Sequence, residues 1–199
     1  MKLTLTQMLT LDGVMQGPGG PDEDTGGGFT QGGWVWPYFD NDFGRFMDDN
    51  FRRADAFLLG RHTYEIFAAY WPKVSGDPVS DALNSLPKHV ASTTLTSTDW
   101  EGARIVEGDV AERVAALKEQ PGRELQMHGS AGLARSLFGH GLIDTLHLIT
   151  VPVVLGAGKR LFAEGALPTA FRQADTRVTG TGVVISTYER EGAPQYGSF

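Results

Sequence analysis

The chain has 199 residues, of which 41% are hydrophobic and 10% aromatic, and its formal net charge is −7. This composition allows a sizeable core and argues against wholesale disorder. An acidic chain without a basic run is a poor general binder of nucleic acid or anionic membrane. The chain has no cysteine, which excludes disulfides and cysteine-ligated zinc and fits a reducing compartment. We therefore expect a cytoplasmic protein without a metal site.

The first residues alternate polar and apolar side chains, which predicts a strand at residues 2–11 and no signal peptide. No segment approaches the roughly 18 apolar residues that span a bilayer. The remaining pattern predicts helices at 38–53, 63–70, 79–86, 109–120 and 129–138, strands at 54–60, 88–94, 104–107, 124–128 and 145–155, and a closing hairpin at 171–179 and 182–190. Strands that alternate with helices before an all-β end predict one α/β domain over residues 1–199. Its sheet should be largely parallel with an antiparallel edge.

Residues 13–33 are rich in glycine and join the first strand to the first helix. Long loops in compact domains are usually functional or disordered. We interpret this one as a mobile flap over a substrate, with Trp34 and Trp36 beyond it as an apolar wall for a planar ring. A disordered surface insertion is the alternative.

An apolar run ends at Gly60 and is followed by Arg61, His62 and Thr63, after which helix-forming residues begin. This is the pattern of a strand, a glycine turn and a helix. Free N–H groups and the positive end of the helix dipole favour a phosphate at such a turn. Arg61 can add a charge-assisted bond, and Thr63 can cap the helix or donate its hydroxyl. An ordinary turn with a surface arginine is an equal alternative on this motif alone.

A second strand, turn and helix follow the same plan around Gly129, Ser130, Ala131 and Gly132. Alone, this pattern is more typical of a plain tight turn than of a phosphate site. Two such junctions in a parallel sheet would meet at the same edge, where α/β proteins bind ligands. The strand predicted at 88–94 ends in Ser92, Thr93 and Thr94, whose hydroxyls suit either a polar turn or a phosphate.

The order of several motifs resembles the dihydrofolate reductase superfamily over nearly the whole chain. They are Leu11-Asp12-Gly13, Leu59-Gly60-Arg61-His62-Thr63-Tyr64-Glu65, Ser92-Thr93-Thr94, Gly129-Ser130, Leu142-Ile143-Asp144-Thr145-Leu146 and Pro152-Val153-Val154-Leu155-Gly156-Ala157-Gly158. The branch that the chain resembles most is the reductase domain of the bifunctional riboflavin-biosynthesis deaminase–reductase and its stand-alone relatives. The deaminase half needs a cysteine-containing zinc site, so that half is absent from this chain.

The resemblance implies a dihydrofolate-reductase-like α/β/α fold, a homodimer and NADPH as the cofactor. It implies that Gly60, Arg61, His62 and Thr63 meet the cofactor phosphates. Ser92 and Thr93 would lie near the adenosine phosphate, and Gly129, Ser130, Ala131 and Gly132 would hold the pyrophosphate. The family usually has two glycines at that last turn, so Ser130 is a departure. The dimer interface would involve residues 146–155 and the terminal hairpin.

The residues that would handle the substrate are harder to choose. Dihydrofolate reductases carry an acid on the first helix, and Asp42 is our choice for that role among Asp40, Asp42, Asp48 and Asp49, although a solvated helix face explains each of them. Trp36 and Gly156 are candidate substrate-binding residues. Lys159 and Arg160 would either meet a substrate phosphate or be solvated. Residues 67–72 replace a segment that is typical of riboflavin reductases.

Two further polar residues suit structural roles. We expect Asp12 to orient the turn after the first strand by accepting backbone N–H bonds, and His147 to be a satisfied core histidine. Two functions remain open at this point. One is an NADPH-dependent reductase of a pyrimidine or pteridine-like compound, with 5-amino-6-(5-phosphoribosylamino)uracil as the leading substrate. The other is a non-catalytic nucleotide-binding or sensor protein.

Overall fold

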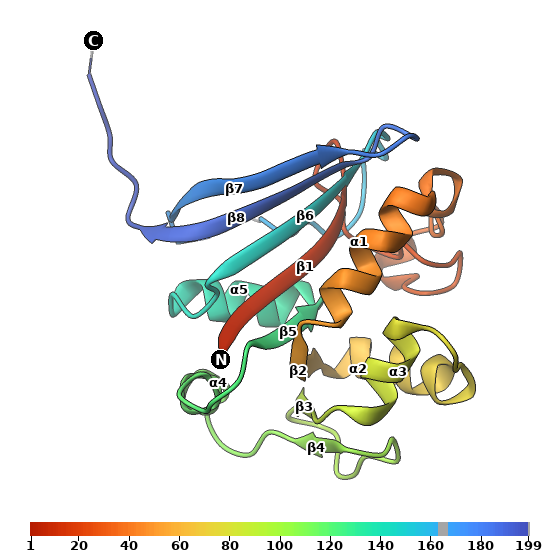
Figure 1. Ribbon diagram of the computed structural model, residues 1–199, viewed down its shortest axis with the longest axis vertical. Coiled ribbons are helices and arrows are strands. Elements are labelled where there is room, and N and C mark those ends of the chain that lie inside the picture. The colour runs from red at the N-terminus through yellow and green to blue at the C-terminus, as the bar shows by residue number, and fades with distance from the viewer. Residues whose placement is uncertain (163–166, 199) are drawn as a thin grey trace.

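The computed structural model describes residues 1–162 and 167–198, which share one eight-stranded sheet in the order β4-β3-β2-β5-β1-β6-β8-β7 (Figure 1). The strands are β1 (Lys2–Thr10), β2 (Ala54–Gly60), β3 (Lys88–Ala91), β4 (Ala103–Ile105), β5 (Glu124–His128), β6 (Thr145–Val151), β7 (Ala170–Val178) and β8 (Val184–Gly192). Neighbours from β4 to β6 are parallel, whereas β8 is antiparallel to both β6 and β7. The predicted mostly parallel sheet with an antiparallel C-terminal edge is confirmed.

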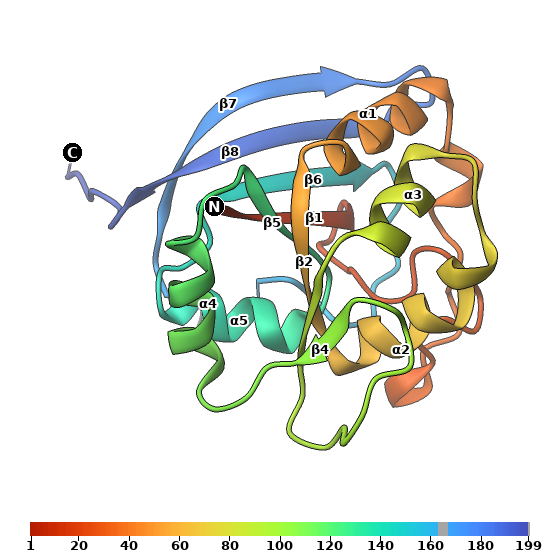
Figure 2. The same ribbon diagram turned by 60° about the horizontal axis from the view of Figure 1, so that its bottom comes forward.

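Helices cover both faces of this sheet. They are α1 (Asn41–Phe51), α2 (Arg61–Tyr70), α3 (Pro78–Ser85), α4 (Val110–Lys118) and α5 (Ala131–Gly139), with short 3-10 turns η1 (Gly26–Gly28), η2 (Trp36–Tyr38) and η3 (Trp71–Lys73). Helices α4 and α5 lie on one side, and α1 and α3 lie on the other (Figure 2). No helix within the described residues is long and apolar enough to span a bilayer.

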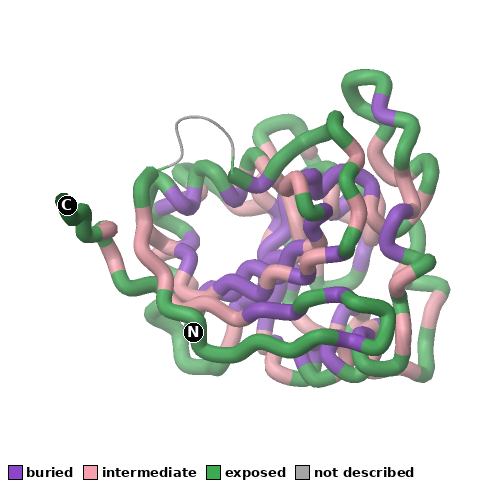
Figure 3. Tube along the Cα trace, turned by 90° about the horizontal axis from the view of Figure 1, so that it is seen from above, coloured by how far each residue is buried: buried purple, intermediate pink, exposed green. Residues whose placement is uncertain are grey.

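The core lies between these layers, where Figure 3 shows buried residues along the strands. Leu5 and Leu125 of the sheet pack against Leu137 of α5. On the opposite face, Phe43 and Phe46 of α1 pack against β6 and β8. Phe43 and Phe46, which lie almost one turn apart on α1, are therefore core residues.

Several predicted elements are shorter in the structure, and for three of them the reason is identifiable. Helix α1 begins at Asn41 and not at Tyr38, because Asp40 caps it by accepting the Phe43 N–H at 2.9 Å. Strand β3 ends at Ala91, because Ser92 Oγ accepts the N–H groups of Thr94 and Leu95 and turns the chain. Strand β6 ends at Val151, next to Pro152, which lacks the N–H that a ladder needs.

Candidate functional site

The two glycine turns come together at one edge of the sheet. Strands β2 and β5 are parallel neighbours, so their carboxyl ends, at Gly60 and His128, lie at the same edge. Thr63 Oγ1 and Ser130 Oγ, which belong to different turns, are 2.7 Å apart. A Cβ atom on Gly60 would lie 2.2 Å from Ser130 Oγ. Glycine is therefore required at this junction for the two turns to approach.

Both helices that start at these turns lack a side-chain cap. Gly60 is the N-cap of α2 and Ser130 is the N-cap of α5, and neither makes a side-chain cap bond. Gly129 and Ser130 have positive φ angles of 79° and 23°, a conformation that glycine adopts readily and serine rarely. First-turn N–H groups and two helix dipoles therefore face the same space, which suits an anion.

Arg61 lies beside this anion site on the surface. Its Nε donates to Glu65 Oε1 at 2.7 Å and its guanidinium donates to Thr94 Oγ1 at 2.6 Å. The guanidinium thus links α2 to the turn after β3, which Ser92 holds. A basic group and several hydroxyls meet here, next to the paired helix starts.

One cavity of about 550 Å³ extends from the paired turns into the body of the protein. It brings together eight of the candidate residues: Trp36, His62, Thr63, Gly129, Ser130, Ala131, Gly132 and Lys159. The others lie outside its lining: Asp42, Gly60, Arg61, Ser92, Thr93 and Gly156. Gly60, Arg61 and Ser92 still border the paired turns through the contacts described above.

The opposite end of the cavity is apolar and was largely missed from the sequence. Its walls come from η2, α1, α2 and η3, and the side chains are those of Trp36, Phe39, Met47, Phe51, Ile66, Phe67 and Trp71. The sequence gives one indication of this apolar end, because residues 67–72 depart from the segment that is typical of riboflavin reductases. Met47 and Phe51 could not be chosen over their neighbours without knowing how α1 is rotated.

Residues 13–33 form one wall of the cavity and pack against the rest of the protein. Trp34 Nε1 donates to the Gln16 carbonyl at 2.9 Å, and Gly33 N donates to the Gly17 carbonyl at 2.8 Å. The Met15 N–H donates to the Lys159 carbonyl at 2.8 Å. Trp34 is therefore buried inside the segment and forms no part of the cavity wall, so of the two tryptophans expected there only Trp36 reaches the cavity. The segment lines the cavity as expected of a flap, and its mobility stays a prediction.

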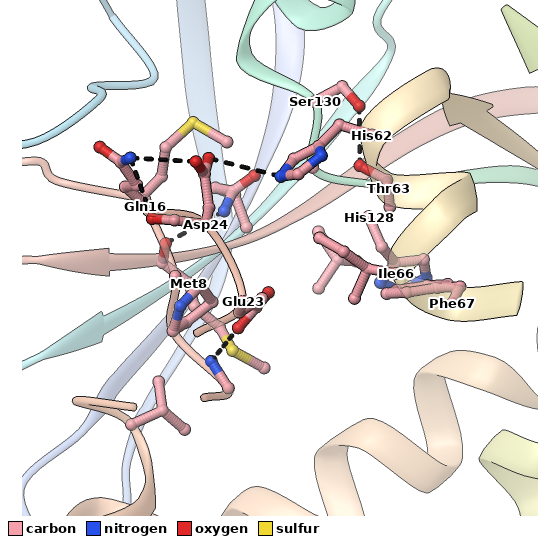
Figure 4. A pocket seen from close by; sticks show the side chains of 18 of the residues that line it. Met8, Gln16, Glu23, Asp24, His62, Thr63, Ile66, Phe67, His128 and Ser130 are labelled. Atoms are coloured by element: carbon pink, nitrogen blue, oxygen red, sulfur yellow. Dashed lines mark hydrogen bonds and ion pairs between the residues drawn. The ribbon is translucent and has the colours of Figure 1, made fainter. Parts of the chain in front are cut away.

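Two acids of this segment, Glu23 and Asp24, line the cavity (Figure 4). Burial would raise the pKa of Asp24, but bonds from Lys159, the Gly26 N–H and Gln16 outweigh it and hold that pKa below its usual range. Asp24 Oδ2 is 2.6 Å from Lys159 Nζ and 3.8 Å from His62 Nε2.

Glu23 is placed differently. Burial is the largest effect on it and raises the pKa of the Glu23 carboxyl, against the opposing effect of the Gly19 and Gly20 N–H groups. Both N–H groups donate to Oε2, the second at 3.1 Å. No hydrogen bond within the described residues uses Glu23 Oε1. The sequence pattern of a glycine-rich loop gave no reason to select this acid.

The acids of α1 do not enter the cavity. Asp42 lies on the exposed face and pairs with Arg45 one helical turn later, which corrects its expected position in the site. Asp40 caps the helix and accepts the Thr181 N–H at 2.9 Å. The side chains that α1 presents to the cavity are Met47 and Phe51.

The loop after β6 contacts the turn after β1 through Asp12. Asp12 Oδ2 accepts the Gly156 N–H at 2.9 Å, and Oδ1 accepts the Leu155 N–H and the Thr10 hydroxyl. The Thr10 bond, followed by the backbone N–H groups, lowers the pKa of Asp12 to about 2. Asp12 thus orients the turn as predicted. Gly156 contacts Asp12 and does not line the cavity.

Two histidines, His128 and His147, lie at or near the wall of the cavity. His128 lines it and stacks on Phe51 with ring centroids 4.5 Å apart, and burial lowers the pKa of His128 to about 3. His147 Nδ1 lies 2.9 Å from Thr187 Oγ1, and burial followed by the nearby charge of Arg53 lowers the pKa of His147 to about 4. His147 is a satisfied core histidine, as expected.

This fold and cavity define a reductase-like α/β protein, and the sequence places it in a family. The profile of the RibD C-terminal domain matches residues 1–185, so the chain belongs to that family. It is 29% identical over 196 residues to the protein YyaP of Bacillus subtilis (strain 168), with 96% of both chains covered.

Solved structures confirm the fold. A putative riboflavin biosynthesis protein from Shewanella sp. PV-4 superposes with a TM-score of 0.71 at 20% identity, covering 96% of this chain and 99% of the other. Dihydrofolate reductase from Enterococcus faecalis, complexed with NADP(H), superposes with a TM-score of 0.61 at 17% identity, covering 96% of each chain. The predicted dihydrofolate-reductase-like fold is confirmed, and the family match confirms the predicted relation to the riboflavin reductase domain.

Proposed function

We propose that this protein is an NADPH-dependent reductase of a pyrimidine or pteridine-like compound. The single observation that carries the proposal is that two uncapped helix N-termini, at Gly60 and Ser130, meet at one place. The hydroxyl oxygens of Thr63 and Ser130 are 2.7 Å apart there. This arrangement suits a diphosphate, since each helix start offers N–H groups and a positive dipole end. A reduced nicotinamide would supply a hydride, while the protein supplies binding and orientation.

The preference for NADPH over NADH rests on the surroundings of Arg61. Its guanidinium faces the turn that carries Ser92, Thr93 and Thr94, where charge-assisted bonds to an additional phosphate can form. The apolar end of the cavity would then hold the substrate ring against Trp36 and Phe51. Residues 15–24 of the flap would exclude water from the reacting centre.

The test is calorimetry of the full chain with NADPH and NADH, followed by NADPH oxidation with pterins, dihydrofolate and the riboflavin intermediate. We expect NADPH to bind at least tenfold tighter than NADH. Equal affinities, or binding of neither, would reject the cofactor assignment. Binding without oxidation of NADPH by any of these compounds would favour a non-catalytic nucleotide-binding protein.

We also propose a cytoplasmic homodimer built from residues 1–199 as one domain. Strand β7 is the last strand of the sheet, and most of its residues are exposed. Val178 is 67% exposed, and Val184 on the adjacent strand is 37% exposed. An uncovered edge strand invites pairing, and a second subunit would cover it. Light scattering at micromolar concentration should give twice the monomer mass; a monomer mass would reject the dimer.

A further inference from the structure

We infer that the substrate is an uncharged planar heterocycle that carries no phosphate. The inference deepens the proposed reductase function and rests on it. It distinguishes this protein from a reductase that acts on 5-amino-6-(5-phosphoribosylamino)uracil, because that compound carries a phosphate. Three features of the substrate end of the cavity support it: its aromatic walls, its lack of an available cation, and the carboxyl group of Glu23.

The walls favour a flat, apolar face on the ligand. Trp36 and Phe39 have ring centroids 5.6 Å apart, and Phe67 and Trp71 have centroids 6.2 Å apart. All four line the cavity, together with Met47 from α1. Aromatic side chains of this kind stack on planar rings. Phe39 and Phe67 offer no hydrogen bond to a phosphate oxygen, and the Trp36 indole already donates to the Gly19 carbonyl. The Trp71 indole could donate one neutral hydrogen bond, which lacks the charge that phosphate sites usually supply.

Cations are scarce where a substrate phosphate would lie. Lys159 is the one lysine or arginine among the described residues that line the cavity, and its Nζ is 2.6 Å from Asp24 Oδ2. Arg45 of α1 pairs with Asp42, and Lys73 of η3 donates to the Ala69 carbonyl at 2.8 Å. Neither lines the cavity. Phosphate recognition in proteins usually relies on charge-assisted bonds from arginine or lysine, or on helix N-termini.

The helix N-termini are not available to the substrate in this arrangement. The helix starts at Gly60 and Ser130 belong to the end that holds the cofactor diphosphate in the proposed function. The start of α3, where Val79 lines the cavity, is already capped by the Asp77 carboxylate, which accepts the Val79 and Ser80 N–H groups. A substrate phosphate at the same place would have to displace the cofactor. The reaction needs cofactor and substrate at once, so this excludes a shared site.

Glu23 adds a positive reason for an uncharged ligand. Its carboxyl group lines the cavity, with Oε2 bound to backbone N–H groups and Oε1 free of hydrogen bonds from the described residues (Figure 4). Oε1 can accept a ring N–H or amino group, as pyrimidines and pteridines present. The titratable side chains that act on Glu23 are those of Asp24, which is also acidic, and His62. Since Asp24 is paired with Lys159, the like charge that an approaching phosphate meets comes chiefly from the ionised Glu23 carboxyl group.

The experiment compares two ligands that differ only by a phosphate. Calorimetry on the NADP⁺-saturated full chain at pH 8 would use 5-amino-6-ribosylaminouracil and its 5′-phosphate. We expect the unphosphorylated compound to bind at least tenfold tighter. Equal or tighter binding of the phosphate would overturn the inference, and binding of neither would overturn the pyrimidine class. Because NADP⁺ binding is measured first, a failed cofactor assignment is distinguished from a failed substrate assignment.

A pair of variants tests the charge argument. Glu23→Gln keeps the shape of the side chain and removes its charge, and it should narrow the preference between the two ligands at least threefold. Asp42→Asn removes a charge of the same sign on the exposed face of α1 and should leave the preference unchanged. If both variants keep the wild-type ratio, Glu23 does not select against phosphate and this part of the inference fails.

Discussion

The two ends of the cavity differ in the groups that line them: backbone N–H groups at one end and side chains at the other. At the end where we propose that the cofactor diphosphate binds, here called the phosphate end, backbone N–H groups of two helix starts face the cavity, and small residues let the turns approach. At the substrate end, side chains from η2, α1, α2 and η3 form the walls. In the proposed function, backbone groups would recognise a diphosphate that is common to many reactions, whereas side chains can be exchanged without disturbing the fold. One fold can therefore keep its cofactor and change its substrate.

The largest effect is expected at the phosphate end, from Gly60→Ala. The new Cβ would lie 2.2 Å from Ser130 Oγ and 2.6 Å from Ser130 Cβ, so one turn has to move. We expect a loss of about 1–3 kcal/mol in the free energy of unfolding and no measurable NADPH binding. Thermal unfolding and calorimetry would measure both.

The matched control is Gly139→Ala in α5, where an added Cβ meets nothing within 4 Å. That change should leave NADPH binding intact and stabilise the helix by up to ~1 kcal/mol. If Gly60→Ala behaves like Gly139→Ala, the close approach of the two turns is not required, and the contrast between the two ends breaks down.

This difference also explains what could be predicted from the sequence. The phosphate end follows from local patterns, because an apolar run, a glycine and a helix start are adjacent in the chain at Gly60 and again at Gly129. The largely parallel sheet with an antiparallel edge follows from strands that alternate with helices before an all-β end, whereas the order of the strands is known only from the structure. Glu23 and Met47 could not be predicted, since their positions depend on the path of the flap and on the rotation of α1. Asp42 was chosen on resemblance, and the cap at Asp40 places it on the exposed face.

The second prediction concerns how the free energy of unfolding depends on pH, through a histidine that packs behind the substrate end of the cavity. His147 packs against Phe46 of α1, which carries Met47 and Phe51 to the cavity. In the folded protein the pKa of His147 is about 4, below the ordinary 6.5. Between these values the unfolded state binds a proton that the folded state does not, so stability falls as the pH falls. From pH 7 to pH 4 this group should remove on the order of 3 kcal/mol.

Urea unfolding at several pH values would measure this loss. His147→Gln should unfold with a flatter pH dependence over that window, although it is less stable at pH 7. His140→Gln, a change at an exposed histidine, should keep the wild-type slope. A His147→Gln slope equal to that of the wild type would show that His147 titrates normally in the folded protein.

The third prediction concerns the preference of the phosphate end for NADPH over NADH. Arg61→Ala should weaken NADPH binding by about 1.5–3 kcal/mol, because a charged hydrogen bond is lost. NADH affinity should change little, since the guanidinium faces the turn after β3 and not the cavity. Calorimetry with both dinucleotides would measure the difference, with Arg45→Ala as a surface control. Equal losses for NADPH and NADH would place Arg61 at the shared diphosphate.

The smallest effect concerns the flap, which joins the two ends. Asp24 ties it to Lys159 at 2.6 Å and approaches His62 of the phosphate end at 3.8 Å. An ion pair of this kind contributes up to about 1 kcal/mol, so Asp24→Asn should speed amide hydrogen exchange in residues 16–28 of the free protein by roughly two- to fivefold. Asp22→Asn, at an exposed neighbour, should not change the exchange rate.

NADPH with a substrate should slow exchange in the wild-type flap, because closure orders its glycines. Exchange that ligands leave unchanged would show that the flap is a fixed wall, and the substrate end would then be as rigid as the phosphate end.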